Sequence, residues 1–174
     1  MDSSFVGNNC EILHIYSHYN IEYDMPFTAC HISNDLQYLD LCLNYDMYMT
    51  IEPTFKQDSG CEYPVMVVGD IEIHCYHYKT ESEVVEKYKR RRERQKSKKL
   101  VFLWGDMLLY DLHSKEEHAE IKAKFLTLPN SIYLEEGVHL PFKNFDPSVT
   151  NGPTAKFVDA IYPLYIQEID RLIG

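Results

Sequence analysis

The fold is decided by the stretch LVFLW (residues 100–104), five consecutive apolar residues that predict a strand buried on both faces. Strands of this kind belong to parallel sheets that helices cover on each side. Helical patterns precede and follow the stretch, over residues 81–98 and from Ser114 through Leu126. The stretch therefore indicates an α/β fold, in which strands alternate with helices.

Capping boxes, in which Ser or Thr is followed three residues later by Glu, mark the start of both helices at Thr80-Glu81-Ser82-Glu83 and at Ser114 with Glu117. Further helices are expected after Asn9, after residues 33–35 and over residues 154–172. Extended segments are expected at residues 4–7, 47–55, 63–68, 71–78 and 131–134. We therefore predict one α/β domain over residues 1–174, three-layered, with a mainly parallel sheet of about five strands and some antiparallel edge.

Composition and charge exclude several classes of protein. The 174 residues are 45% apolar and 25% charged, as in globular domains. The formal charge of −10 argues against a nucleic-acid partner, and no run of about 18 apolar residues predicts a membrane span. Five cysteines without CxxC spacing predict neither a zinc ribbon nor a disulfide framework, and the first residues do not resemble a signal peptide. We therefore expect a cytoplasmic protein.

Residues 71–78 alternate as in a strand. The pattern places Ile71, Ile73, Cys75 and His77 on one face and Glu72, His74, Tyr76 and Tyr78 on the other. His77 would then close the strand just before the helix that Thr80 caps.

Polar residues follow three of the expected strands: Asn8 and Asn9 after the first, His77 before the capped helix, and Asp106 after the apolar stretch. Ligands of open α/β sheets bind beyond the carboxyl ends of parallel strands. If these strands are parallel neighbours, the four side chains converge on a polar ligand. The alternative is that they are helix caps and turn residues.

The helix over residues 81–98 is basic near its end, since residues 87–99 contain nine basic residues and one acidic residue. Guanidinium groups match the geometry of phosphate and carboxylate, although a solvated helix face would have the same composition. The arginines lie about 15 Å from the helix start and cannot share one phosphate with it. We therefore expect a small anionic ligand near His77 and Thr80, and a protein partner or a phosphate at Arg91 and Arg94.

Signatures of cofactor sites are missing. The sequence contains neither GxxxxGK[ST] nor GxGxxG, and no GxSxG nucleophile elbow. His14 and His18 have the spacing of two metal ligands on a helix, but no third ligand stands near them. We expect no cofactor and no metal.

The segment GDIEIHCYHYKTESE (residues 69–83) resembles the GDIEIHFxHYKxxEEA segment of a bacterial family labelled exopolysaccharide biosynthesis protein, a domain of unknown function. YKRRRER (residues 88–94) resembles that family's W-x-RR-x-x-R helix. NNC (residues 8–10) and FLTLP (residues 125–129) resemble its first and last motifs. The resemblance covers about residues 8–134, and the segment 135–174 diverges. Glu11-Ile12-Leu13 stands where the family usually has Trp-Gly-Gly.

The resemblance implies a participant in exopolysaccharide or surface-polysaccharide biosynthesis. A transferase acting on a sugar-phosphate or nucleotide-sugar would use His77 or Asp106 as its general base. Its ligand would be bound by Asn8, Asn9, Tyr78 and Thr80. The alternative is a non-catalytic binding or assembly module of the same pathway.

Overall fold

The computed structural model describes residues 2–8, 12–57, 59–105, 114–134 and 153–173. Within them, β1 (Ser3–Val6), β5 (Lys99–Gly105) and β6 (Ser131–Leu134) form a parallel sheet with β5 in the centre. Phe5 lies opposite Val101, and Leu103 lies opposite Ile132. The prediction of a buried parallel strand at residues 100–104 is confirmed.

A second, antiparallel sheet contains β2 (Thr54–Phe55), β3 (Val65–Val68) and β4 (Ile71–His74), in that order. Gly69 begins the turn between β3 and β4 with a φ of 63°, and a Cβ there would lie 3.0 Å from the Tyr48 ring, so only glycine fits without strain. The protein is thus a mixed α/β protein. The single sheet of about five strands is not confirmed, because the described strands divide between two three-stranded sheets.

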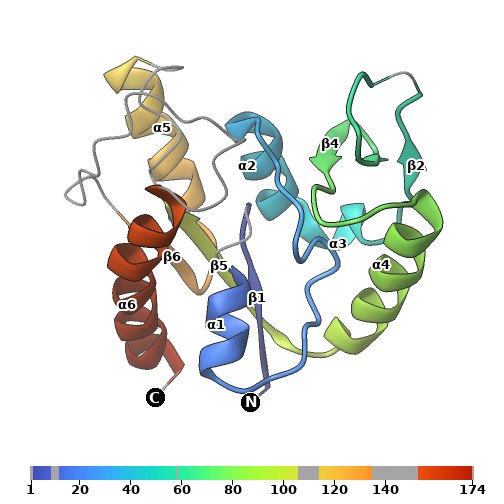
Figure 1. Ribbon diagram of the computed structural model, residues 1–174. Helices are drawn as coiled ribbons and strands as arrows, with labels where there is room; N and C mark the ends of the chain where they lie inside the picture. The colour runs from blue at the N-terminus through green and yellow to red at the C-terminus, as the bar shows by residue number, and fades with distance from the viewer. Residues whose placement is uncertain (1, 9–11, 58, 106–113, 135–152, 174) are drawn as a thin grey trace.

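Helices cover both faces of the parallel sheet (Figure 1). The helices within the described residues are α1 (Ile12–His18), α2 (Asp35–Leu43), α3 (Tyr45–Tyr48), α4 (Glu81–Gln95), α5 (Lys115–Phe125) and α6 (Pro153–Ile173). The Phe5 ring contacts Tyr16 of α1, and helix α1 packs beside α6. The Trp104 ring contacts Tyr38 of α2 and Phe125 of α5. Phe5 and its register partner Val101 share one face of the sheet. Side chains alternate between the faces along a strand, so Trp104, three residues after Val101, lies on the other face. The two sets of helices therefore lie on opposite faces of the parallel sheet.

The predicted helix caps are present. Asn34 accepts a hydrogen bond from the Gln37 amide at 3.0 Å, and Thr80 Oγ1 accepts one from the Glu83 amide at 3.2 Å. Ser114 and Glu117 make both halves of a capping box. In the box at Thr80, the Glu83 carboxylate accepts instead from the amide of Lys79, one residue earlier than expected.

Two predicted extended segments differ from the structure. Residues 47–55 contain only the short β2, because α3 occupies their start and buries Tyr45 and Tyr48. The strand expected over residues 71–78 ends at His74, where the Tyr78 amide donates to Cys75 O at 3.0 Å and turns the chain. The predicted alternation therefore fails after Cys75: His77 is exposed, whereas Tyr78 is buried.

Candidate functional site

Residues 30–32, the bridging segment, connect the carboxyl end of β1 to the end of β4. The Ile32 amide donates to Asn8 O at 2.9 Å. His31 and His74 exchange two backbone hydrogen bonds of 2.9 and 2.8 Å. Because Asn8 follows β1, these bonds place the end of the antiparallel sheet at the carboxyl edge of the parallel sheet, where α/β folds bind ligands.

Four side chains gather at this junction: His31, Tyr63, His74 and Tyr76, which we call the histidine–tyrosine cluster. The Tyr76 ring stacks on the His74 ring with centroids 5.8 Å apart, and it lies 4.5 Å from the Tyr63 ring and 6.0 Å from the His31 ring. Tyr63 Oη lies 3.4 Å from His74 Nδ1. Tyr76 is 45% exposed, so the centre of the cluster is accessible from solvent.

The environment of the cluster favours neutral side chains. Burial lowers the pKa of His31, and repulsion from His74 lowers it further, while a hydrogen bond with the Asn8 backbone opposes both effects. Burial raises the pKa of Tyr63 above the usual value for a phenol, and hydrogen bonds with Cys61 and Tyr76 add to the rise. At neutral pH the cluster therefore offers aromatic faces together with uncharged hydrogen-bonding groups at His31 and Tyr63. Such a surface suits the hydroxyl groups and C–H faces of a sugar ring.

The predicted strand-end residues are found only in part at this junction. Asn8 is buried next to the bridging segment, and His77 follows Tyr76 with its side chain exposed. Asn9 and Asp106 lie outside the described residues, so convergence of the four side chains stays a prediction.

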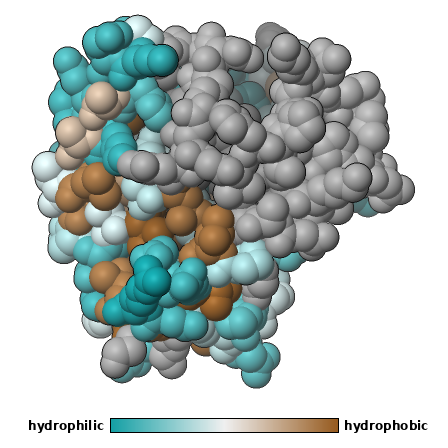
Figure 2. All heavy atoms as spheres, turned by 90° about the vertical axis from the view of Figure 1, so that its left-hand side faces the viewer, coloured by the Kyte–Doolittle hydropathy of each residue, from teal (hydrophilic) through white to brown (hydrophobic). Residues whose placement is uncertain are grey.

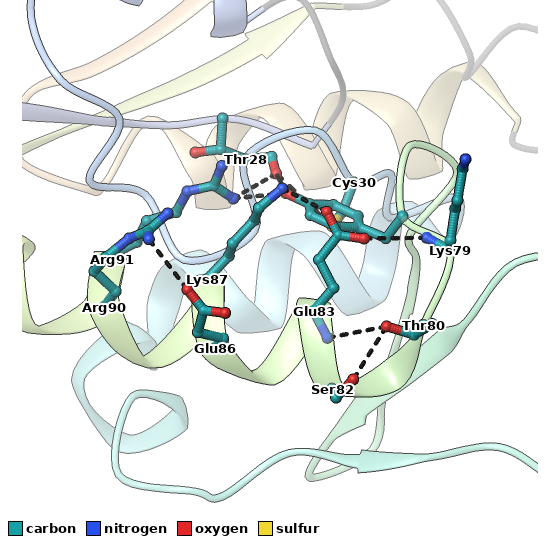
Figure 3. Close-up of polar contacts among 11 residues, drawn as sticks. Thr28, Cys30, Lys79, Thr80, Ser82, Glu83, Glu86, Lys87, Arg90 and Arg91 are labelled. Atoms are coloured by element: carbon teal, nitrogen blue, oxygen red, sulfur yellow. Dashed lines mark hydrogen bonds and ion pairs between the residues drawn. The ribbon is translucent and has the colours of Figure 1, made fainter.

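Tyr78 and Arg91 contact each other inside the protein. Tyr78 Oη donates to Thr28 O at 2.7 Å. Arg91 Nη1 donates to Tyr78 Oη at 2.7 Å and to Thr28 O at 2.9 Å, and Figure 3 shows its guanidinium extending from α4 to Thr28. Burial raises the pKa of Tyr78 to about 12, so the phenol keeps its proton. Arg91 is only 7% exposed, whereas both a solvated helix face and a partner surface would require an exposed side chain.

Thr80 and Arg94 also have partners within the chain. Thr80 caps α4 (Figure 3), and Arg94 pairs with Glu22 and donates to Tyr23 O at 3.2 Å. A ligand could recruit these groups, or Tyr78 and Arg91, only by exchanging such contacts. Their assignment as ligand or partner contacts therefore stays a prediction.

Sequence reasoning missed His31 and Tyr63 as members of the cluster. His74 and Tyr76 belong to the alternating pattern of residues 71–78, but His31 meets His74 across 43 residues of sequence, and no local pattern marks that pairing. For Arg91 a signal did exist. The buried side chains of α4 are Val84, Tyr88, Arg91 and Gln95, and this helical spacing extends the apolar face into the basic region.

The described ranges hold neither a cluster of metal ligands nor a helix that could span a membrane. There, no three His, Cys, Asp or Glu side chains lie close enough together to hold a metal ion. No helix in the same ranges combines the length and the apolar character that crossing a bilayer requires.

A groove of about 480 Å³, with both apolar and polar lining residues, lies between β6 and the end of α6. Its apolar lining comes from Leu126, Ile132, Leu134 and Leu172. Figure 2 shows hydrophobic side chains gathered on this side of the molecule. Ser131, Tyr133, Glu168 and Arg171 also line the groove, and the last two pair with each other.

Comparison with known proteins places these residues in a family. A family model described as a domain of unknown function (DUF1919) matches residues 1–136, a range that includes the histidine–tyrosine cluster and α4. A protein of Haemophilus influenzae described as "Uncharacterized protein" is 33% identical over 103 residues. The match covers 58% of this chain and 48% of the relative, so the chain spans about half of the relative's length.

Proposed function

Because the chain belongs to the DUF1919 family, we propose a function for the histidine–tyrosine cluster, which lies within the matched range. The cluster is a carbohydrate-binding surface, and the protein takes part in exopolysaccharide or surface-polysaccharide biosynthesis. The observation that carries the binding proposal is the exposed Tyr76 ring, surrounded by two imidazoles and a phenol at the carboxyl edge of the parallel sheet. The pathway rests on the resemblance of residues 69–83, which contain His74 and Tyr76, to the exopolysaccharide family segment.

The ligand we propose is a sugar-phosphate or a nucleotide-sugar. Its sugar ring would stack on Tyr76, since aromatic rings bind the apolar face of a sugar while neutral imidazole and phenol groups hydrogen-bond its hydroxyls. Asn8, Asn9, Tyr78 and Thr80 remain the polar contacts that we propose for this ligand. A cytoplasmic location is part of this proposal, and it is supported by the described cysteines, which form no disulfide with one another, as is usual in a reducing compartment.

A transferase mechanism would use His77 or Asp106 as general base. The base would remove the proton of an acceptor hydroxyl as that oxygen attacks the sugar, and the phosphate would leave. The proposal of His77 as the base is supported by its exposed side chain and by its position directly after Tyr76 in the sequence.

Calorimetric titration with a panel of nucleotide-sugars, free nucleotides and free sugars tests the binding surface. Tyr76→Ala should weaken the binding of the best ligand at least tenfold, because the stacking face is lost, whereas Tyr76→Phe should largely retain it. Leu126→Ala is the matched control, since Leu126 is about equally exposed but lies in the groove beside β6. Loss of affinity in Leu126→Ala, with Tyr76→Ala unchanged, would refute the assignment.

The alternative function is a non-catalytic binding or assembly module of the same pathway. The two functions differ in turnover. Incubation of the bound sugar-phosphate or nucleotide-sugar with acceptor glycans should yield a transferred product that His77→Ala fails to make. If the wild-type protein binds the ligand and returns it unchanged, the non-catalytic module is the correct assignment.

A further inference from the structure

Two thiols lie in contact beneath the histidine–tyrosine cluster. Cys30 Sγ and Cys75 Sγ are 3.4 Å apart, and both residues are buried, with 4% and 0% exposed. Neither of the two is in a disulfide in this structure. Cys30 begins the bridging segment, and Cys75 directly follows β4.

The backbone explains why the two sulfur atoms meet. His31 and His74 form a hydrogen-bonded antiparallel pair, so the next residues outward, Cys30 and Cys75, face each other as a non-hydrogen-bonded pair. Their amides donate elsewhere, to Phe27 O and Pro64 O. In such pairs the Cα atoms approach to about 4.5 Å and the side chains leave the same face. That separation lies within the range that a disulfide spans.

We propose that Cys30 and Cys75 are an oxidation site that closes reversibly into a cross-strand disulfide. The oxidant is a peroxide, small enough to reach Cys30, the less buried of the two. The Cys30 thiolate attacks one peroxide oxygen, becomes a sulfenic acid and releases water or an alcohol. The Cys75 sulfur then attacks Cys30 Sγ and displaces the sulfenic oxygen as water. In total, two thiols lose two protons and two electrons to one peroxide.

The disulfide would fasten the bridging segment to the end of β4. The two cysteines are 45 positions apart in the sequence, and closing a loop of this length restricts the unfolded state. His31 and His74 stand next to the bond, so oxidation would also hold the two histidines of the cluster in their present pairing. This inference does not depend on the proposed sugar ligand.

The test is to treat the reduced, folded protein with hydrogen peroxide, block the remaining thiols with N-ethylmaleimide and map the peptides without reduction. We expect a linked pair of peptides containing Cys30 and Cys75, two fewer alkylated cysteines, and recovery of both thiols with dithiothreitol. The oxidised protein should unfold at a midpoint roughly 5–10 °C higher than the reduced protein. Its His31 and His74 amides should exchange hydrogen more slowly.

Matched variants locate the site. Cys30→Ser and Cys75→Ser should each prevent the linkage, whereas Cys42→Ser, which alters a buried cysteine on α2, should leave it intact. The wild-type peptide map decides the question even if a variant folds poorly. An unchanged thiol count, a link through another cysteine, oxidation of Cys30 to sulfinic acid without a link, or a lowered midpoint would each overturn the proposal.

Discussion

Replacing Arg91 by alanine should destabilise the protein strongly, while the same change at its neighbour Arg90 should not. Arg91 is buried, and its Nη1 donates to Thr28 O and Tyr78 Oη at 2.9 and 2.7 Å. The Arg90 side chain is exposed and pairs with exposed Glu86, one helical turn earlier. The two variants therefore compare an internal guanidinium with a surface one on the same helix.

The magnitude follows from the contacts of the Arg91 guanidinium. A hydrogen bond from a charged donor contributes about 1.5–3 kcal/mol, and the Tyr23 ring, 5.8 Å away, adds roughly 0.5–1 kcal/mol. Two effects reduce the loss of stability in Arg91→Ala. Tyr78 still donates to Thr28 O, and folding no longer requires the removal of water from a buried guanidinium. We expect a net loss of about 3 kcal/mol for Arg91→Ala. For Arg90→Ala we expect a loss below about 0.5 kcal/mol.

Urea unfolding followed by far-ultraviolet circular dichroism measures both losses, and thermal unfolding should show a midpoint roughly 6–12 °C lower for Arg91→Ala. Arg91→Lys should fall between wild type and alanine, because an ammonium keeps the charge but lacks the planar donor geometry. Equal stability of Arg91→Ala and Arg90→Ala would show that the Arg91 side chain lies at the surface. The packing of α4 against residues 23–28 would then be wrong.

Two further predictions concern acid stability and helix capping. Because the folded state lowers the pKa of His31 below the usual 6.5, the unfolded chain takes up the proton first, so this contribution to stability is present above about pH 6.5 and is lost as the pH falls. The free energy of unfolding, measured at pH 7.5 and 5.5, should therefore depend less on pH in His31→Asn than in wild type. The control is His14→Asn, which alters an exposed histidine of α1 and should behave like wild type. An equal pH dependence in all three proteins would contradict this reasoning. Thr80→Ala should cost about 1 kcal/mol in urea unfolding through the lost hydrogen bond to the Glu83 amide, and Thr80→Ser should cost much less; an unchanged midpoint for Thr80→Ala would argue against the cap.

The sequence alone determined the features that depend on neighbouring residues. The caps at Asn34, Thr80 and Ser114 are bonds to an amide three residues ahead, so the residue types and their spacing suffice to predict them. The run at residues 100–104 predicted the central strand for a similar reason, since only a strand covered on both faces is apolar at every position.

Tertiary structure decided which side chains those elements bury and which they bring together. Arg91 looks like a surface residue of a basic helix, yet Thr28 O and Tyr78 Oη, from distant parts of the chain, satisfy its donors and allow its burial. The junction at His31 and His74 depends on backbone pairing between segments far apart in sequence, and local propensity carries no information about such a pairing. The division of the strands into two sheets has the same cause: the edge of β4 pairs with the bridging segment, while β1 pairs with β5.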